Sequence, residues 1–126
     1  AATVQEPRKV NKYRNTPTTR ATASGAVLRF DSMKEARRFD WLIERERRGE
    51  IRELRLQVDF TLQEAYTDTE GRRVRAIRYR ADFTYYEGAR GVKVVEDVKS
   101  RATRTKEYAM KKKMLKDRFG LDITEV

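Results

Sequence analysis

The sequence predicts an α/β domain in which a mixed sheet is flanked by two helices, in the order helix, strand, strand, strand, helix, strand. Three observations support this prediction. Apolar residues recur at helical spacing in two stretches, they alternate with polar residues in two others, and turns containing glycine separate the stretches. The 126 residues suffice for one domain with a single modest core.

The first helix is expected over residues 32–48, where apolar residues recur every three or four positions and Gly49 follows as a C-terminal cap. A second helix is expected over about 103–119, with Gly120 after it. The residues expected to face inward from the second helix are Tyr108, Met110, Met114, Leu115 and Phe119.

Three strands are expected between the helices, and residues 122–126 are expected to form a last short strand. Two of the three alternate apolar and polar residues, so each is expected to present one apolar face. These apolar sets are Leu54, Leu56, Val58, Phe60 and Leu62, followed by Ile77, Tyr79, Ala81, Phe83 and Tyr85. The third strand, 92–99, is more apolar throughout, which predicts a central position in the sheet.

Residues 1–24 differ in character from the rest of the chain. They contain both prolines, several basic residues and no apolar period, so they are expected to form a flexible basic arm before a domain spanning 25–126. Lys12 and Arg14 of this arm are candidates for contact with phosphates. The alternative is a solvated tail with no binding role.

The composition restricts the chemistry. The chain has no Cys and no His, which excludes thiol nucleophiles, disulfides, histidine general bases and ordinary zinc sites. The net charge of +10 favours a polyanionic partner, although a merely soluble basic protein is the alternative. No apolar run approaches the roughly 20 residues of a membrane span, so we expect a cytoplasmic protein with no membrane partner.

Three residues on two adjacent predicted strands form the candidate catalytic site. Asp82 lies on the second strand, and Asp97 and Lys99 share one face of the third, with Glu96 on the other face. Lys99 is the only lysine of the chain with an acid two positions before it. Without histidine, phosphodiester cleavage needs a divalent cation to activate a water for attack. Mg²⁺ is the expected cation because it is bound by one or two carboxylates and several waters. An ammonium beside them could stabilise charge on the phosphate.

Each candidate also has a structural interpretation. The two aspartates could belong to a salt-bridge network with the many arginines, and Lys99 could be a solvated lysine at a strand end. Glu35 is a fourth candidate, but Ser32 and Glu35 have the spacing of a capping box, in which Glu35 would return to the Ser32 N–H. The sequence leaves both roles of Glu35 open.

The chain resembles small phage-borne proteins of unknown function assigned to the PD-(D/E)XK, or restriction-endonuclease-like, superfamily. The segments that carry this resemblance are 12–15, 30–36, 56–62, 79–83, 95–99 and the helix containing Tyr108, Lys111 and Lys112. The resemblance implies an αβββαβ core and maps metal ligands onto Glu35, Asp82 and Asp97 and the catalytic lysine onto Lys99. Ala81 replaces the proline that gives the motif its name.

The expected function is therefore that of a Mg²⁺-dependent DNA endonuclease, in which Mn²⁺ can substitute. Its substrate is expected to be duplex or branched DNA, such as a Holliday junction, in phage recombination or replication inside a bacterial host. The second helix is expected to contribute DNA contacts through Lys106, Lys111, Lys112 and Lys113. Cutting a four-way junction symmetrically would call for a homodimer. The alternative is a non-catalytic nucleic-acid-binding module on the same fold.

Overall fold

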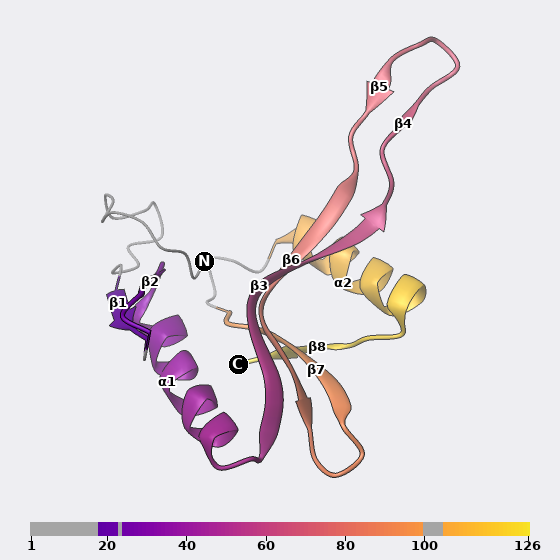
Figure 1. Ribbon diagram of the computed structural model, residues 1–126. Helices are drawn as coiled ribbons and strands as arrows, with labels where there is room; N and C mark the ends of the chain where they lie inside the picture. The colour runs from indigo at the N-terminus through magenta and orange to yellow at the C-terminus, as the bar shows by residue number, and fades with distance from the viewer. Residues whose placement is uncertain (1–17, 23, 100–104) are drawn as a thin grey trace.

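The computed structural model describes residues 18–22, 24–99 and 105–126. Its central sheet has four strands (Figure 1). In sheet order they are β3 (Ile51–Gln63), β6 (Ile77–Glu87), β7 (Val92–Asp97) and β8 (Ile123–Glu125). The first three pair antiparallel, whereas β8 runs parallel to β7, so the sheet is mixed. With helices α1 (Met33–Arg47) and α2 (Lys106–Phe119), the predicted α/β class and the order of its six main elements are confirmed.

Capping hydrogen bonds set where the helices begin and where α2 ends. The Ser32 hydroxyl accepts a hydrogen bond from the Glu35 N–H at 3.1 Å, which satisfies one free donor of the first turn of α1. At α2, the Thr105 hydroxyl accepts from the Tyr108 N–H in the same way. Gly120 then takes a left-handed conformation, φ 69°, and donates its N–H to the Lys116 carbonyl, ending the helix. The expected start of α2 at residue 103 lies outside the described residues.

Two of the inward-facing residues expected of α2 are exposed in the structure. Leu115 is fully buried and Tyr108 and Met114 pack against the same cluster, but Met110 is 48% exposed. Met110 follows Tyr108 by two positions, and residues two apart on a helix do not share a face. Phe119 is also largely exposed, although its ring contacts that of Phe60 edge-on at 5.5 Å.

The prediction that each alternating strand presents one apolar face to a single core is wrong. The apolar residues of β3 and β6 pack into two separate clusters. Two clusters divide their residues along the strand length. The cluster beside α1 contains Phe83 and Tyr85, with Leu54 and Leu56 packed against it. The cluster beside α2 contains Leu62, Tyr79 and Ala81, with Phe60 and Ile77 packed against it. Long strands twist, and β3 also has register irregularities, so its two halves face different helices (Figure 1).

The expected boundary of the N-terminal arm at residue 24 is too late. Residues Thr18–Ala21 form strand β1, which pairs antiparallel with β2 (Val27–Phe30). Arg20 of β1 forms a bidentate ion pair with Asp40 of α1, at 2.8 and 2.9 Å. This strand has few apolar residues. It is held by backbone pairing with β2 and by that ion pair, and neither produces a periodic pattern in the sequence. The rest of the arm lies outside the described residues.

A second small sheet was not predicted. Strands β4 (Tyr66–Thr67) and β5 (Arg73–Val74) pair antiparallel across a turn that contains Gly71. They extend the β3–β6 hairpin away from both helices as a two-stranded ribbon, residues 64–76 (Figure 1). Within the described residues, no helix is long and apolar enough to cross a membrane.

Candidate functional site

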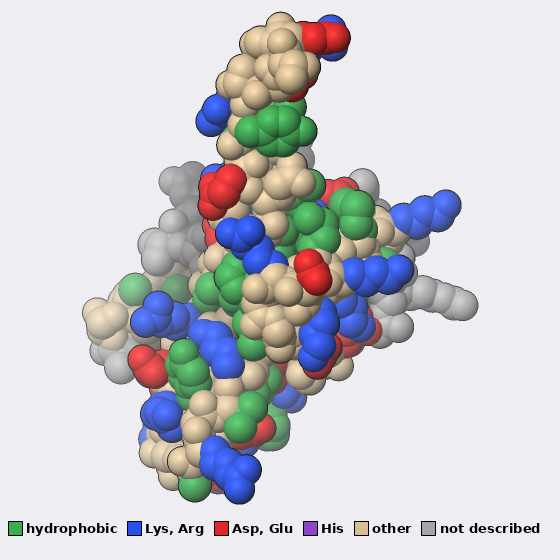
Figure 2. Space-filling model, turned by 90° about the vertical axis from the view of Figure 1, so that its right-hand side faces the viewer, with side chains coloured by type: hydrophobic (Ala, Val, Ile, Leu, Met, Phe, Trp, Pro, Cys, Tyr) green, Lys and Arg blue, Asp and Glu red, His purple; other side chains and the backbone are tan. Residues whose placement is uncertain are grey.

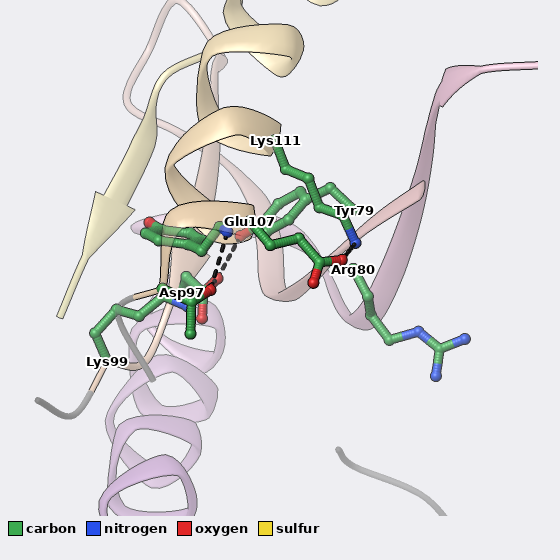
Figure 3. Close-up of a pocket in the computed structure, with 8 residues that line it drawn as sticks. Tyr79, Arg80, Asp97, Lys99, Glu107 and Lys111 are labelled. Carbon is green, nitrogen blue, oxygen red and sulfur yellow. Dashed lines mark hydrogen bonds and ion pairs between the residues drawn. The ribbon is translucent and has the colours of Figure 1, made fainter. Parts of the chain in front are cut away.

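A cleft of ≈ 280 Å³ opens where β6 and the end of β7 meet the first turns of α2 (Figure 3). Its lining comes from three parts of the chain that are far apart in sequence. The residues are Tyr79 and Arg80 of β6, Asp97 and Lys99 at the end of β7, and Thr105, Glu107, Tyr108 and Lys111 at the start of α2. Two of the predicted catalytic residues, Asp97 and Lys99, therefore lie in a cleft.

The acids Glu96 and Asp97 project to opposite faces of β7, as the sequence predicts. Glu96 is fully buried on the α1 side, where the Arg38 guanidinium donates two hydrogen bonds to it at 2.8 and 2.6 Å, and the Tyr85 hydroxyl donates a third. Asp97 accepts a hydrogen bond from the Tyr79 hydroxyl at 2.7 Å on the other side. Of the two acids, only Asp97 lines the cleft.

Lys99 is held tightly for a lysine at a strand end. It is 9% exposed, its ammonium lies 3.2 Å from the Asp97 carboxylate, and the same ammonium lies 3.6 Å from the centre of the Tyr108 ring. Tyr108 is in turn anchored by its hydroxyl, which donates to Glu125 at 2.6 Å. Lys99 is thus a buried ammonium placed by a carboxylate and an aromatic ring, not a solvated side chain.

Hydrogen bonds also hold the backbone that carries Asp97 and Lys99. The Asp97 carbonyl accepts from the Val126 N–H, and the Lys99 N–H donates to the Val126 carbonyl, both at 3.1 Å. The Val98 N–H donates to Asp82 at 2.8 Å, and the Lys34 ammonium of α1 donates to the Lys99 carbonyl at 2.7 Å. The short segment after β7 is therefore tied to β6, β8 and α1 at once.

Asp82 lies among like charges. Burial raises its pKa most, and the carboxylates of Glu35 and Asp97 raise it further, to about 8, against the hydrogen bond from Val98 that lowers it. Glu35 is 5% exposed, and burial first, then the charges of Asp31 and Asp97, raise its pKa as well. Three acids from α1, β6 and β7 are therefore brought within electrostatic range of one another.

Gln57 contributes to this group from β3. Its side-chain amide donates to Asp82 at 3.2 Å, and its backbone is in the left-handed region, φ 53°. A residue with a side chain adopts this conformation at a cost of order 1–3 kcal/mol, and such residues are concentrated at functional sites. The left-handed residue of β3 is therefore one that contacts the acid cluster.

The residues present fit a hard divalent cation. Asp82 and Asp97 offer carboxylate oxygens within electrostatic range of each other, and a positive ion would relieve their repulsion. In the described part of the chain, no three acidic side chains converge closely enough to form a complete ligand set. The arrangement suits a cation such as Mg²⁺, which keeps several waters and needs only one or two carboxylates.

The predicted DNA-binding residues are not gathered in one place. Lys111 lines the cleft and forms an ion pair with Glu107 at 3.1 Å (Figure 3). Lys112 lies 3.4 Å from Glu125, and Lys113 lines a separate hollow near Leu62. Lys106 is exposed at the start of α2, and Lys12 and Arg14 lie outside the described residues.

Sequence reasoning missed the residues that position this site. Tyr79 and Tyr108 were counted only as core residues, yet their hydroxyl and ring hold Asp97 and Lys99. Lys34 was not singled out at all. The signal that could have found Tyr79 is its polar hydroxyl at a position predicted to be buried, because such a group needs a partner.

Comparison with known proteins adds a family but no function. Residues 11–124, which include Glu35, Asp82, Asp97 and Lys99, match a family described as protein of unknown function (DUF1064). No match was found among curated proteins or among solved structures. The match covers most of the chain, and the protein therefore belongs to the DUF1064 family.

Proposed function

We propose that this protein is a Mg²⁺-dependent endonuclease that hydrolyses phosphodiester bonds in DNA. The observation that carries the proposal is that Asp97 and the buried ammonium of Lys99 line one cleft, with Asp82 and Glu35 within electrostatic range of Asp97. A structural salt-bridge network would pair these acids with arginines. Instead, Asp82 and Asp97 lie within electrostatic range of each other and Asp97 pairs with Lys99, and like charges held this close are typical of a cation site.

The proposed roles follow from the contacts. Asp82 and Asp97 hold the cation, with Glu35 as a further ligand directly or through water. When bound, the cation would lower the pKa of a water and offset charge on the phosphate. The Lys99 ammonium lies 3.2 Å from the Asp97 carboxylate, where it can stabilise the phosphate in the transition state. Tyr79 and Tyr108 are positioning residues for Asp97 and Lys99.

DNA is the proposed substrate because the chain carries 30 basic and 20 acidic residues, and this surplus of positive charge favours a polyanion. The resemblance to the PD-(D/E)XK superfamily supports the same chemistry and the same type of core. Its phage-borne members suggest branched DNA, such as a Holliday junction, as the substrate, and two copies of the protein would then act together.

The proposal is tested by replacing each aspartate with asparagine. Asp82→Asn and Asp97→Asn should each abolish Mg²⁺-dependent cleavage of labelled linear and branched DNA, because each removes a charged ligand. DNA binding should persist or strengthen, since a carboxylate near the phosphate is lost. Asp122→Asn is the control, because Asp122 is exposed and pairs only with Lys116 on the surface.

Two results would contradict the proposal. One is cleavage by Asp97→Asn at the wild-type rate. The other is DNA binding by the wild-type protein with no cleavage of any substrate in Mg²⁺ or Mn²⁺, which would favour the non-catalytic binding module.

A further inference from the structure

The ribbon of residues 64–76 is the most exposed part of the fold. It stands clear of the rest of the molecule (Figure 2), and its two short strands pair only with each other. Tyr66 at the start of β4 is 48% exposed. A two-stranded hairpin gains little stability by itself in water. A ribbon whose strands pair with no other described strand is therefore suited to contact a partner.

The tip of the ribbon is neutralised internally. Asp68 accepts hydrogen bonds from the backbone N–H groups of Glu70 and Arg72, both at 2.9 Å, which fixes the turn. The side chains of Glu70 and Arg72 then form an ion pair with each other. These side chains shape the turn, and with Asp68 and Glu70 against Arg72 the tip has no net positive charge to offer a polyanion.

The stem of the ribbon has a different charge pattern. Arg73, Arg75 and Arg78 are all exposed, and none of them forms an ion pair with a described residue. Glu64 is the single acid among the stem residues 63–67 and 73–78. The strand that leads back into β6 therefore forms a cationic edge whose three arginines form no ion pair with a described residue, although Asp59 lies within electrostatic range of Arg78.

This cationic edge leads directly to the cleft. Arg78 and Arg80 lie two positions apart on β6 and so share a face, and Arg80 lines the cleft. Arg80 is paired with Asp59 at 2.8 and 3.0 Å. Arg73, Arg75 and Arg78 form no such pair with a described residue, so their charges are the ones available to a ligand. A ligand whose scissile bond lies in the cleft would meet the ribbon on one side.

We propose that the stem of the ribbon, through Arg73, Arg75 and Arg78, binds the phosphate backbone of duplex DNA on one side of the cleft. The inference rests on the proposed function and adds where the duplex runs. From Arg73 to Arg80, seven residues of extended chain span about 23 Å. That length matches about seven phosphates of one strand at 3.4 Å per base pair. A two-stranded ribbon is also narrow enough to enter the major groove.

The test measures DNA binding without cleavage. In an Asp97→Asn background, the affinity for a short labelled duplex is measured over a range of salt concentrations for a variant with Arg73→Gln, Arg75→Gln and Arg78→Gln. Each phosphate contact contributes about 0.9 to the slope of log affinity against log salt. Loss of three contacts should lower that slope by about 2.7. Hydroxyl-radical footprinting should show that protection is lost on one side of the cleavage position only.

The matched control carries Arg47→Gln, Arg48→Gln and Arg90→Gln. These exposed arginines give the same change in charge at the opposite end of β3 and β6, and their slope should stay at the background value. A second variant replaces residues 66–74 with an Asn-Gly turn, which removes Arg73 but keeps Arg75 and Arg78, and should lower the slope by about 0.9 and shorten the footprint by less than the triple variant does. Thermal unfolding confirms that each variant is folded.

Three outcomes would overturn the inference. Equal slopes for the ribbon and control variants would show that the stem does not contact DNA. Unchanged slopes, with self-association in sedimentation lost only in the ribbon variants, would assign the ribbon to a second copy of this chain. Absence of DNA binding by the Asp97→Asn background and by the wild type would overturn the proposed function together with this inference.

Discussion

Two tyrosines of β6 hold two acids of β7 on opposite faces of the sheet. Tyr79 donates its hydroxyl to Asp97 at 2.7 Å, and Tyr85 donates to Glu96. Burial raises the pKa of both phenols above their usual value, as do the neighbouring carboxylates, so each remains a proton donor. The two tyrosines therefore offer a comparison. The hydrogen bond from Tyr79 orients a proposed catalytic acid, whereas the hydrogen bond from Tyr85 is structural.

We expect Tyr79→Phe to lower activity about 10–100-fold, which is typical of losing a hydrogen bond that orients a metal ligand. The apparent affinity for Mg²⁺ should fall with it, because Asp97 is no longer held in place. The measurement is the rate of cleavage as a function of Mg²⁺ concentration.

Tyr85→Phe serves as the matched control for that experiment. It removes the same hydroxyl from the same strand and should cost a similar stability of about 1 kcal/mol. Its Mg²⁺ dependence should match that of the wild type. An equal loss of activity in both variants would mean that Tyr79 acts only through stability.

The raised pKa of Asp82 predicts how stability depends on pH. Its folded-state pKa of about 8 exceeds the unfolded-state value of about 3.9. The protonated carboxyl therefore contributes stability at low pH, and this contribution is lost as the pH rises through about 8. Between these values the slope for one proton is at most about 1.4 kcal/mol per pH unit.

We expect the free energy of unfolding in urea, measured without metal, to fall from about pH 5 to pH 8. The chain has no histidine, so few other groups titrate in this range. Asp82→Asn should flatten the curve and be more stable than the wild type at the upper end. Mg²⁺ should flatten the wild-type curve, since it favours the ionised acids. Parallel curves for wild type and Asp82→Asn would refute this account.

Among the elements, α1 is joined to β7 by the Arg38–Glu96 ion pair. Glu96 has no exposed surface, and the Arg38 side chain is 25% exposed. Removing one partner of a buried pair leaves an uncompensated charge and costs about 3–5 kcal/mol. We expect Arg38→Met to lower the free energy of unfolding in urea by on the order of 3 kcal/mol. This is the lower end of the range because Arg38 is partly solvated.

A second variant and a control complete that experiment. Arg38→Met combined with Glu96→Leu should recover part of the loss, because no buried charge remains. Arg37→Met changes an exposed arginine next to it on α1 and should alter stability little. A loss as large in Arg37→Met would mean that helix charge, and not the buried pair, is responsible.

The elements that could be predicted are those with local signals. Both helices have an apolar period, a side-chain cap and a glycine after them, and β7 is a short apolar run. Strand β1 and the β4–β5 ribbon have no such period. Their order depends on backbone pairing with a partner strand, which is a non-local interaction, and so they were missed.

At the scale of the whole molecule, two helices on a twisted sheet produce two clusters in place of one core. The end of β7 lies between these clusters. Asp97 and Lys99 can therefore face the cleft beside α2 while Glu96 is locked beside α1. The same twist carries the ribbon away from the core (Figure 1).

The sequence by itself determined the α/β class, the order of the main elements, and the sharing of one face by Asp97 and Lys99, because helical and strand periods are properties of neighbouring residues. Only the tertiary structure decided that Asp82, Asp97 and Glu35 lie within electrostatic range of one another, and that Tyr79 and Tyr108 position the site. These contacts join residues from different elements. They depend on strand register and helix packing, which burial of the two clusters sets for the whole chain at once.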